Sequence, residues 1–344
     1  MSTRAYLFGA AGLGIGIGSG ILLAQYALPR TVPPPVFSIP DPDLHMQRPV
    51  ATLEETAVMG PAQAAAARDI MRYGFPGPVS DRLYRNAYVG SYNRALRNPN
   101  WIAEHLTAKS LERAPSNSLP LALNADVAVE DTPSRKHSTF KEDLAIPRLF
   151  RAKLKDYVAS GYDRGHLVPA ADVRGSQEAM DETFLLTNVS PQVGMGFNRN
   201  YWFYFENFVR SLTSDFDDVY VVTGPLYLPA QQADGKFYVK YEVIGDPPNV
   251  AVPTHFYKVI LGVKNGQTAM QGFVMPNDRI GPVPLESFAM PLDAIERAAG
   301  LVFFPEVSRL KYQPLCKVTK CQIRNFLVES SRGLINSRSR GELG

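Results

Sequence analysis

The chain has 344 residues, 45% of them hydrophobic and 10% aromatic, which is enough apolar material for a packed core and excludes a wholly disordered or fibrous chain. Thirty-six Lys and Arg against 33 Asp and Glu leave a net charge of only +3, so a polyanionic partner would have to bind a local basic surface. Two cysteines, Cys316 and Cys321, are too few for a disulfide scaffold or a four-cysteine zinc site.

The N-terminal residues 6–29 carry no charge between Arg4 and Arg30, and about 20 apolar residues span a bilayer. Gly12, Gly16 and Gly20 have the small-xxx-small spacing that allows close helix packing in lipid. We therefore predict a membrane anchor or targeting segment over residues 1–30, with a cleaved secretory signal as the main alternative.

Three further regions follow from composition. Residues 31–64 contain clustered prolines, which predict an extended linker. Residues 65–328 show no second boundary and predict one folded domain. Residues 329–344 are rich in Ser, Arg and Gly and predict a basic flexible tail.

Within the domain, periodicity predicts a helix over 61–73, a strand over 84–92 and a second helix over 101–111. Residues 184–188 also look like a strand. Four β-rich runs predict strands over 219–224, 238–244, 256–263 and 270–275. The expected class is α+β, with a mainly antiparallel central sheet flanked by helices.

The candidate chemistry begins in the segment 162–167. If Asp163–His166 is extended, its period of two places Arg164 and His166 on one face, and Gly165 between them allows a substrate backbone to come close. A neutral imidazole can take a proton from water near neutral pH, and a guanidinium can meet phosphate charge. The pair therefore predicts phosphodiester hydrolysis.

A Pro-Gly loop over 191–196 and a helix opening near Asn198 follow. The helix has an apolar stripe made of Trp202, Phe205, Val209 and Leu212. Glu206 and Arg210 lie one turn apart, so both can reach one site. Taken singly, Asn198 is typical of a helix N-cap, the Glu206–Arg210 pair of an exposed ion pair and His166 of a structural histidine. The joint spacing of these four residues instead favours one shared catalytic site.

The sequence lacks the residue patterns of other hydrolase classes. His105, expected on a helix, and His255, before a strand, are more typical of structural histidines. The chain has no H-E-x-x-H pattern for a zinc hydrolase and no G-x-S-x-G elbow for a serine hydrolase.

The runs Asp163–His166, Asn188–Gln192 and Asn198–Trp202, with Glu206, resemble the DNA/RNA non-specific endonuclease family, above all its mitochondrial endonuclease G branch in fungal form. The resemblance extends in order over residues 65–328. It includes the segments Tyr73–Pro78, Tyr92–Arg94, Glu104–Leu106, Thr223–Tyr227, Val252–Val259 and Phe273–Asn277.

This resemblance implies a ββα-metal finger in an α+β domain, assembled as a homodimer. It implies His166 as general base, and Asn198 as the protein ligand of one Mg²⁺, with Mn²⁺ able to substitute. Spacing to Glu206 supports Asn198 over Asn200. The implied residues around the phosphate and metal-bound waters are Arg164, Glu206 and Arg210. Weaker candidates for substrate binding are Asp163, Asn188, Arg94 and Arg97.

The expected substrates are DNA and RNA, cut to 5′-phosphate and 3′-hydroxyl ends. Residues 134–170 hold eight Arg and Lys against four acids, and a basic strip grips the phosphate backbone whatever the bases are. Two alternatives remain: a catalytically silent nucleic-acid-binding or scaffold protein, and a membrane-anchored exonuclease on the same fold. The resemblance points to the mitochondrion, at its inner membrane or intermembrane space. Spacing alone leaves a Cys316–Cys321 disulfide open.

Overall fold

The structure is a computed structural model that describes residues 60–74, 81–112 and 133–323. The predicted anchor, nearly all of the linker and the predicted tail lie outside these residues. Within them, no helix is long and apolar enough to cross a membrane. Helix α2 (Pro61–Ile70) begins inside the stretch assigned to the linker, so folded structure starts before residue 65.

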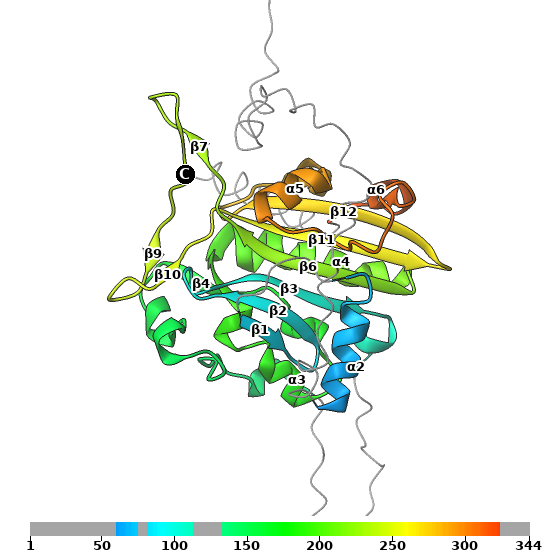
Figure 1. Cartoon of the computed structure of the whole chain (residues 1–344), viewed down its shortest axis with the longest axis horizontal. Coiled ribbons are helices and arrows are strands. Elements are labelled where there is room, and N and C mark those ends of the chain that lie inside the picture. The colour runs from blue at the N-terminus through cyan, green and yellow to red at the C-terminus, as the bar shows by residue number, and fades with distance from the viewer. Residues whose placement is uncertain (1–59, 75–80, 113–132, 324–344) are drawn as a thin grey trace, which may run out of the picture. The chain divides into compact units, whose positions relative to one another are not determined.

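An antiparallel sheet forms the centre of the domain (Figure 1). Its strands follow the order β1-β2-β3-β6-β11-β12-β13. Their bounds are β1 Asp81–Tyr84, β2 Tyr88–Asn93, β3 Asn98–Leu106, β6 Asp218–Leu226, β11 His255–Lys264, β12 Gln267–Pro276 and β13 Ala289–Met290. The short strand β14 (Gln313–Pro314) pairs parallel to β12. The α+β class and the mainly antiparallel sheet are therefore confirmed.

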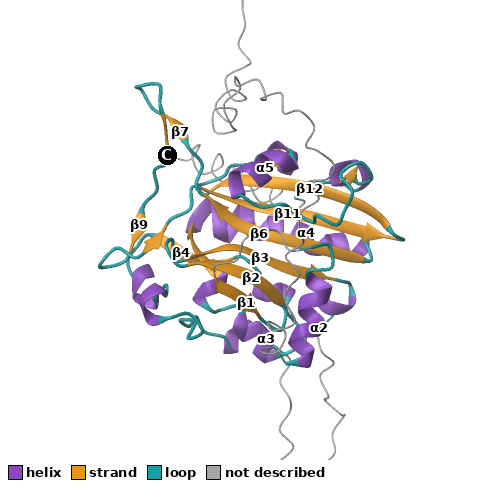
Figure 2. Cartoon of the chain, viewed as in Figure 1, coloured by secondary structure: helices purple, strands orange, loops and turns teal. Residues whose placement is uncertain are grey.

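Helices cover both faces of this sheet (Figure 2). On one face, α2 and α5 (Leu292–Ala299) pack on alternate strand residues such as Tyr220 and Val222. On the other face, α4 (Phe203–Ser211) packs on the intervening residues, including Val219 and Val221. The predicted apolar stripe of α4 is buried on that face, as its spacing required.

Three small ribbons complete the strands: β4 (Tyr162–His166) with β5 (Val189–Val193), β7 (Ala230–Gln231) with β8 (Phe237–Tyr238), and β9 (Val243–Ile244) with β10 (Val250–Ala251). The remaining helices are short. They are α3 Gln177–Glu182, α6 Leu315–Val318 and 3₁₀ turns at 109–111, 135–137, 148–150, 154–157, 170–172, 186–188, 212–214 and 285–288.

The helix predicted over 101–111 is wrong, because Asn98–Leu106 is the strand β3. This strand lies between β2 and β6, with Trp101 buried on one face and Ile102 on the other. A strand buried on both faces has a nearly continuous apolar run, which periodicity cannot separate from a buried helix.

Three other boundaries also differ. The single strand predicted over 84–92 is the β1–β2 hairpin, which turns at residues 85–87. The run 238–244 contributes only the short strands β8 and β9 to two separate ribbons. The strand expected at 184–188 comes later, as β5, after a 3₁₀ turn, and β5 tolerates Pro191 because β4 is its one partner strand among the described residues.

Two side-chain links stabilise segments at the edge of the domain. His105 on β3 bonds Asp69 of α2 through Nδ1 and Asp218 of β6 through Nε2, and its ring stacks on Tyr220. This histidine is therefore structural, as expected, although it lies on a strand. Cys316 and Cys321 form a disulfide at the end of the described chain.

Candidate active site

The strand pair β4–β5 places the proposed catalytic histidine. His166 pairs with Val189 and Arg164 with Pro191 in the antiparallel register. The Phe140 ring lies 5.0 Å from the His166 ring, and the Arg164 guanidinium carbon lies 4.6 Å from the centroid of the same Phe140 ring. Arg164 and His166 thus share one face of an extended strand, as the period of two predicted.

Gly165 between them has a different role from the one expected. A Cβ at this position would stand 2.1 Å from the side-chain amide of Gln192, which is fully buried on β5. The absence of a side chain therefore makes room for Gln192 inside the ribbon. The structure gives no support to the expectation that Gly165 admits a substrate backbone.

His166 lies in an aromatic environment that keeps it neutral. Phe184 meets the imidazole edge to face, with ring centroids 4.7 Å apart, and the residue is 9% exposed. Its Nε2 is enclosed and has no hydrogen-bond partner among the residues that the structure describes. Burial, with a smaller effect of the nearby Arg135 charge, lowers the pKa of His166 to about 3. The imidazole is therefore unprotonated at neutral pH, the form that a general base needs.

Asn198 lies on a helical segment, Gly194–Trp202, with wide turns and non-helical backbone at Met195 and Gly196, which continues into α4. Its Nδ2 donates to Oδ2 of Asp163 at 2.9 Å, and Arg199 Nε donates to the same oxygen at 2.7 Å. Burial acts to raise the pKa of Asp163, but these hydrogen bonds outweigh it and the pKa is lowered. Because Asp163 holds the amide nitrogen, the amide orientation of Asn198 is fixed relative to β4.

Glu206 and Arg210 on α4 are partly buried and belong to a charged cluster, defined here as Glu104, Asp172, Glu206, Arg210 and Lys258. Arg210 forms its ion pair with Asp172, in the 3₁₀ turn after β4, and not with Glu206. Arg210 is therefore not part of the exposed ion pair with Glu206 that was the alternative for these two residues taken singly. Burial raises the pKa of Glu206 to about 7, against the opposing charges of Lys258 and Arg210.

Three members of this cluster are absent from the sequence-based site: Glu104, Asp172 and Lys258. Both carboxyl oxygens of Glu104 are enclosed and, within the described part of the chain, lack hydrogen-bond partners. Burial raises the pKa of Glu104 well above its usual range. The sequence does contain one signal of this cluster, a charged residue inside an apolar run, such as Lys258 within Phe256–Val263. The pattern alone does not say which charged residues lie together in the fold.

The weaker candidates are occupied by the protein itself. Asn188 is fully buried, and its side chain bonds the backbone of Val168 and Thr183. Arg94 forms an ion pair with Asp81, and Arg97 donates to a backbone carbonyl at Leu149. Both guanidinium groups also lie over the ring of Phe150, so the structure does not distinguish them as phosphate contacts.

The basic strip at residues 134–170 is more basic at its surface than its composition suggests. Two of its four acids, Asp143 and Asp156, are buried. Most of its cations are exposed, namely Arg135, Lys136, Lys141, Arg148, Lys155 and Arg164. The strip therefore presents a net positive surface beside His166.

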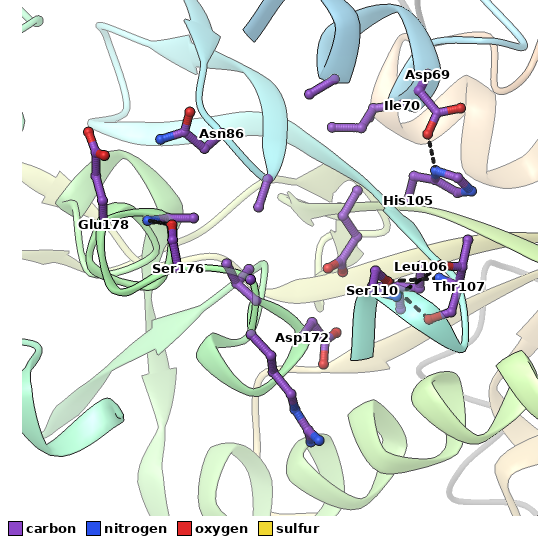
Figure 3. A pocket seen from close by; sticks show the side chains of 17 residues that line it. Asp69, Ile70, Asn86, His105, Leu106, Thr107, Ser110, Asp172, Ser176 and Glu178 are labelled. Atoms are coloured by element: carbon purple, nitrogen blue, oxygen red, sulfur yellow. Dashed lines mark hydrogen bonds and ion pairs between the residues drawn. The ribbon is translucent and has the colours of Figure 1, made fainter. Parts of the chain in front are cut away.

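A pocket of about 540 Å³ lies next to the charged cluster, where α2 and β3 meet the segment 172–179 (Figure 3). Figure 3 shows Asp172 on its wall and His105 joined to Asp69. Glu104 also lines it, but His166 and Asn198 are not among its described lining residues. This pocket thus borders two acids of the charged cluster, Glu104 and Asp172.

The donor set suits a hard cation held by few protein ligands. No group of three or more His, Cys, Asp or Glu in the described segments could hold a metal ion. The hydrogen bond from Asn198 to Asp163 uses Nδ2, which leaves the amide oxygen as an acceptor. Mg²⁺ prefers oxygen ligands and retains several waters, so one amide oxygen fits it.

Two antiparallel strands followed by a helix, with the histidine on the first strand and the asparagine at the start of the helical segment, define the ββα-metal class of metal-dependent nucleases. The sequence matches the DNA/RNA non-specific endonuclease family over residues 66–310, and the chain belongs to this family.

Comparisons with individual proteins agree with this family assignment. The chain is 50% identical over 268 residues to a nuclease of Syncephalastrum racemosum, covering 76% of this chain and 79% of the relative. It is 43% identical over 332 residues to the mitochondrial nuclease of Saccharomyces cerevisiae, covering 94% and 92%. The solved EndoG/EndoGI complex contains a similar chain, with a TM-score of 0.66 and 44% identity over 74% of this chain and 96% of that one.

Proposed function

We propose that this protein is a Mg²⁺-dependent endonuclease that hydrolyses DNA and RNA without sugar or sequence specificity, with Mn²⁺ able to substitute. The observation that carries the proposal is a neutral, buried imidazole and an oriented amide tied to the same strand. His166 lies on β4, and Asn198 bonds Asp163 of β4. Family membership supports the same activity.

In this mechanism His166 accepts the proton of the attacking water. Because Nε2 is enclosed, Nδ1 is the nitrogen that we assign to this transfer. Arg164, exposed on the same face, meets the charge of the phosphate. The products carry 5′-phosphate and 3′-hydroxyl ends.

We assign the metal to the amide oxygen of Asn198, with Glu206 and Arg210 around the phosphate and the waters of the ion. A bound Mg²⁺ supplies Lewis-acid stabilisation of the charge that develops on the phosphate and on the leaving oxygen. Asp163 holds Asn198 in orientation, a role different from the substrate contact expected of it.

Lack of specificity is explained by the basic strip. Contacts to phosphates position a nucleic acid without reading its bases. The exposed lysines and arginines of residues 134–170 provide such contacts beside His166.

Cleavage of closed circular plasmid DNA tests the proposal. The full chain should nick the circle with Mg²⁺ and stop in EDTA, and His166→Ala should lower the rate by about 100- to 10,000-fold. His137→Ala, which removes an exposed imidazole, is the matched control. Equal activity of wild type and His166→Ala would remove the proposed base. No cleavage by either would favour a silent binder, and intact circles beside degraded linear DNA would favour an exonuclease.

We also propose a mitochondrial location, at the inner membrane or in the intermembrane space, with residues 1–30 as anchor, 31–64 as linker, 65–328 as nuclease domain and 329–344 as tail. The relatives in Saccharomyces cerevisiae and Schizosaccharomyces pombe are named as mitochondrial nucleases, which supports the compartment. Fractionation of mitochondria with alkaline extraction tests the anchor.

We further propose a homodimer whose contact includes the ribbon β7–β8. This ribbon exposes Phe237, Tyr238, Val239 and Tyr241, and a two-stranded ribbon alone is marginally stable in water. The charged residues of 229–243 are two acids and two lysines, so this segment carries no net charge and does not favour a polyanion. The mass of the protein in solution, by light scattering, tests the dimer.

A further inference from the structure

Lys258 is a buried lysine in the middle of the central sheet that the mechanism above does not use. It lies on β11, opposite Thr223 of β6, and is 1% exposed. Its Nζ donates to Oγ1 of Thr223 at 2.8 Å and to the backbone carbonyl of Leu167 at 3.1 Å. Leu167 follows His166 directly, so this lysine bonds the end of the strand that carries the proposed base.

The same ammonium group also contacts the other half of the site. Nζ lies 5.0 Å from the ring centroid of Trp202, which is buried one helical turn after Asn198. A cation near an indole face is attracted by the ring quadrupole. One atom of the sheet therefore contacts both the segment of His166 and the segment of Asn198.

Burial and the neighbouring charges act on the pKa of Lys258 in opposite directions, and burial is the larger effect. Burial lowers the pKa of Lys258, while Glu104, Glu206 and Asp172 oppose this and Arg210 adds to it. Replacing a whole buried ion cluster by apolar packing is often neutral or stabilising, but a methionine at 258 alone would remove one positive charge from beside Glu104, Glu206 and Asp172 and is expected to destabilise the fold. Beyond this contribution to stability, the bonds of Nζ to Thr223 and to the carbonyl of Leu167 constrain the segment that follows His166.

We propose that Lys258 is a positioning residue for the hydrolysis, holding the carbonyl after His166 and the indole of Trp202 so that base and metal ligand keep their spacing. The inference rests on the proposed function. It differs from a purely structural role because it requires the geometry of the His166 ring to depend on the ammonium group.

The test compares Lys258→Met with Lys264→Met in the full chain. Lys264 lies on the same strand and also donates to a backbone carbonyl, that of Asp215 at 2.9 Å, but it is exposed and far along β11. Lys258→Met should lower kcat on plasmid DNA about 100-fold, as an ångström-scale misplacement does, and leave KM within about threefold. The ring signals of His166 in an NMR spectrum should shift in Lys258→Met and stay in place in Lys264→Met.

A folded Lys258→Met protein with the kcat of wild type, or with lowered kcat and unshifted His166 signals, would overturn the inference. If Lys258→Met does not fold, Thr223→Val decides, because it removes one acceptor of Nζ and keeps the lysine. It should lower kcat about tenfold and shift the His166 signals, and wild-type behaviour in both would also overturn the inference. An inactive wild type would instead contradict the proposed function, while the NMR comparison would still report on Lys258.

Discussion

The low pKa of His166 makes the stability of the fold depend on pH in a way that one substitution can isolate. The pKa of this imidazole falls from 6.5 to about 3 in the folded protein. Between these values the unfolded chain binds a proton that the folded protein does not. The free energy of unfolding therefore falls as the pH falls from 6.5 towards 3.

The size of this effect follows from the shift. The 2.5 pH units between 6.5 and 4, at about 1.4 kcal/mol per unit, set a ceiling of about 3.5 kcal/mol, and partial protonation near the two pKa values reduces the stability lost between pH 7 and pH 4 to about 3 kcal/mol. His166→Asn has no titrating group at this position and should lack that loss. The raised pKa of Glu206 has the opposite sign, since its neutral form is favoured in the fold, but both proteins share that contribution.

The assay is unfolding in guanidinium chloride with EDTA at pH 7 and pH 4, for wild type and His166→Asn. The loss between the two pH values should be larger in wild type by about 3 kcal/mol. His137→Asn, which removes an exposed imidazole, serves as the control for loss of a histidine. If wild type and His166→Asn lose the same stability, the imidazole is not held neutral by burial and the argument for a neutral base fails.

Two other predictions concern the same site. Gly165→Ala should destabilise the fold by about 1–3 kcal/mol and lower activity, because its methyl group would overlap Gln192, while Gly175→Ala, with open space around its Cα, should change little in the same melting experiment. The pH profile of kcat/KM should rise through about pH 7 as the Glu206 carboxyl ionises, since burial holds its pKa there. The Glu206→Gln profile should lack this limb, and an unchanged limb would assign it to another group.

The sequence predicted the parts of the site that lie close together along the chain. The spacing of Arg164 and His166 along one extended strand gave their common face, and the stripe on α4 gave the buried side of that helix. Both are local periodicities of a regular element, and such patterns carry over directly from sequence to structure.

The rest depends on contacts between distant segments. Arg210 pairs with Asp172, and Lys258 reaches Leu167, across separations that no local pattern encodes. The strand β3 was mistaken for a helix because both of its faces are buried. The role of Gly165 was also missed because it depends on a contact between separate segments: Gln192 lies on β5, the other strand of the ribbon.

The arrangement of acids around the site has a consequence for how the proposed metal binds. Asp163 is occupied by Arg199 and Asn198, and burial raises the pKa of Glu206 to about 7, so below that pH neither provides a free carboxylate in the metal-free protein. On the proposed mechanism the protein then offers the cation a neutral amide oxygen. The charge needed to neutralise a divalent ion must come largely from the phosphates of the substrate. Metal and nucleic acid should therefore bind cooperatively, which couples the Lewis acid to the presence of a bond to cut.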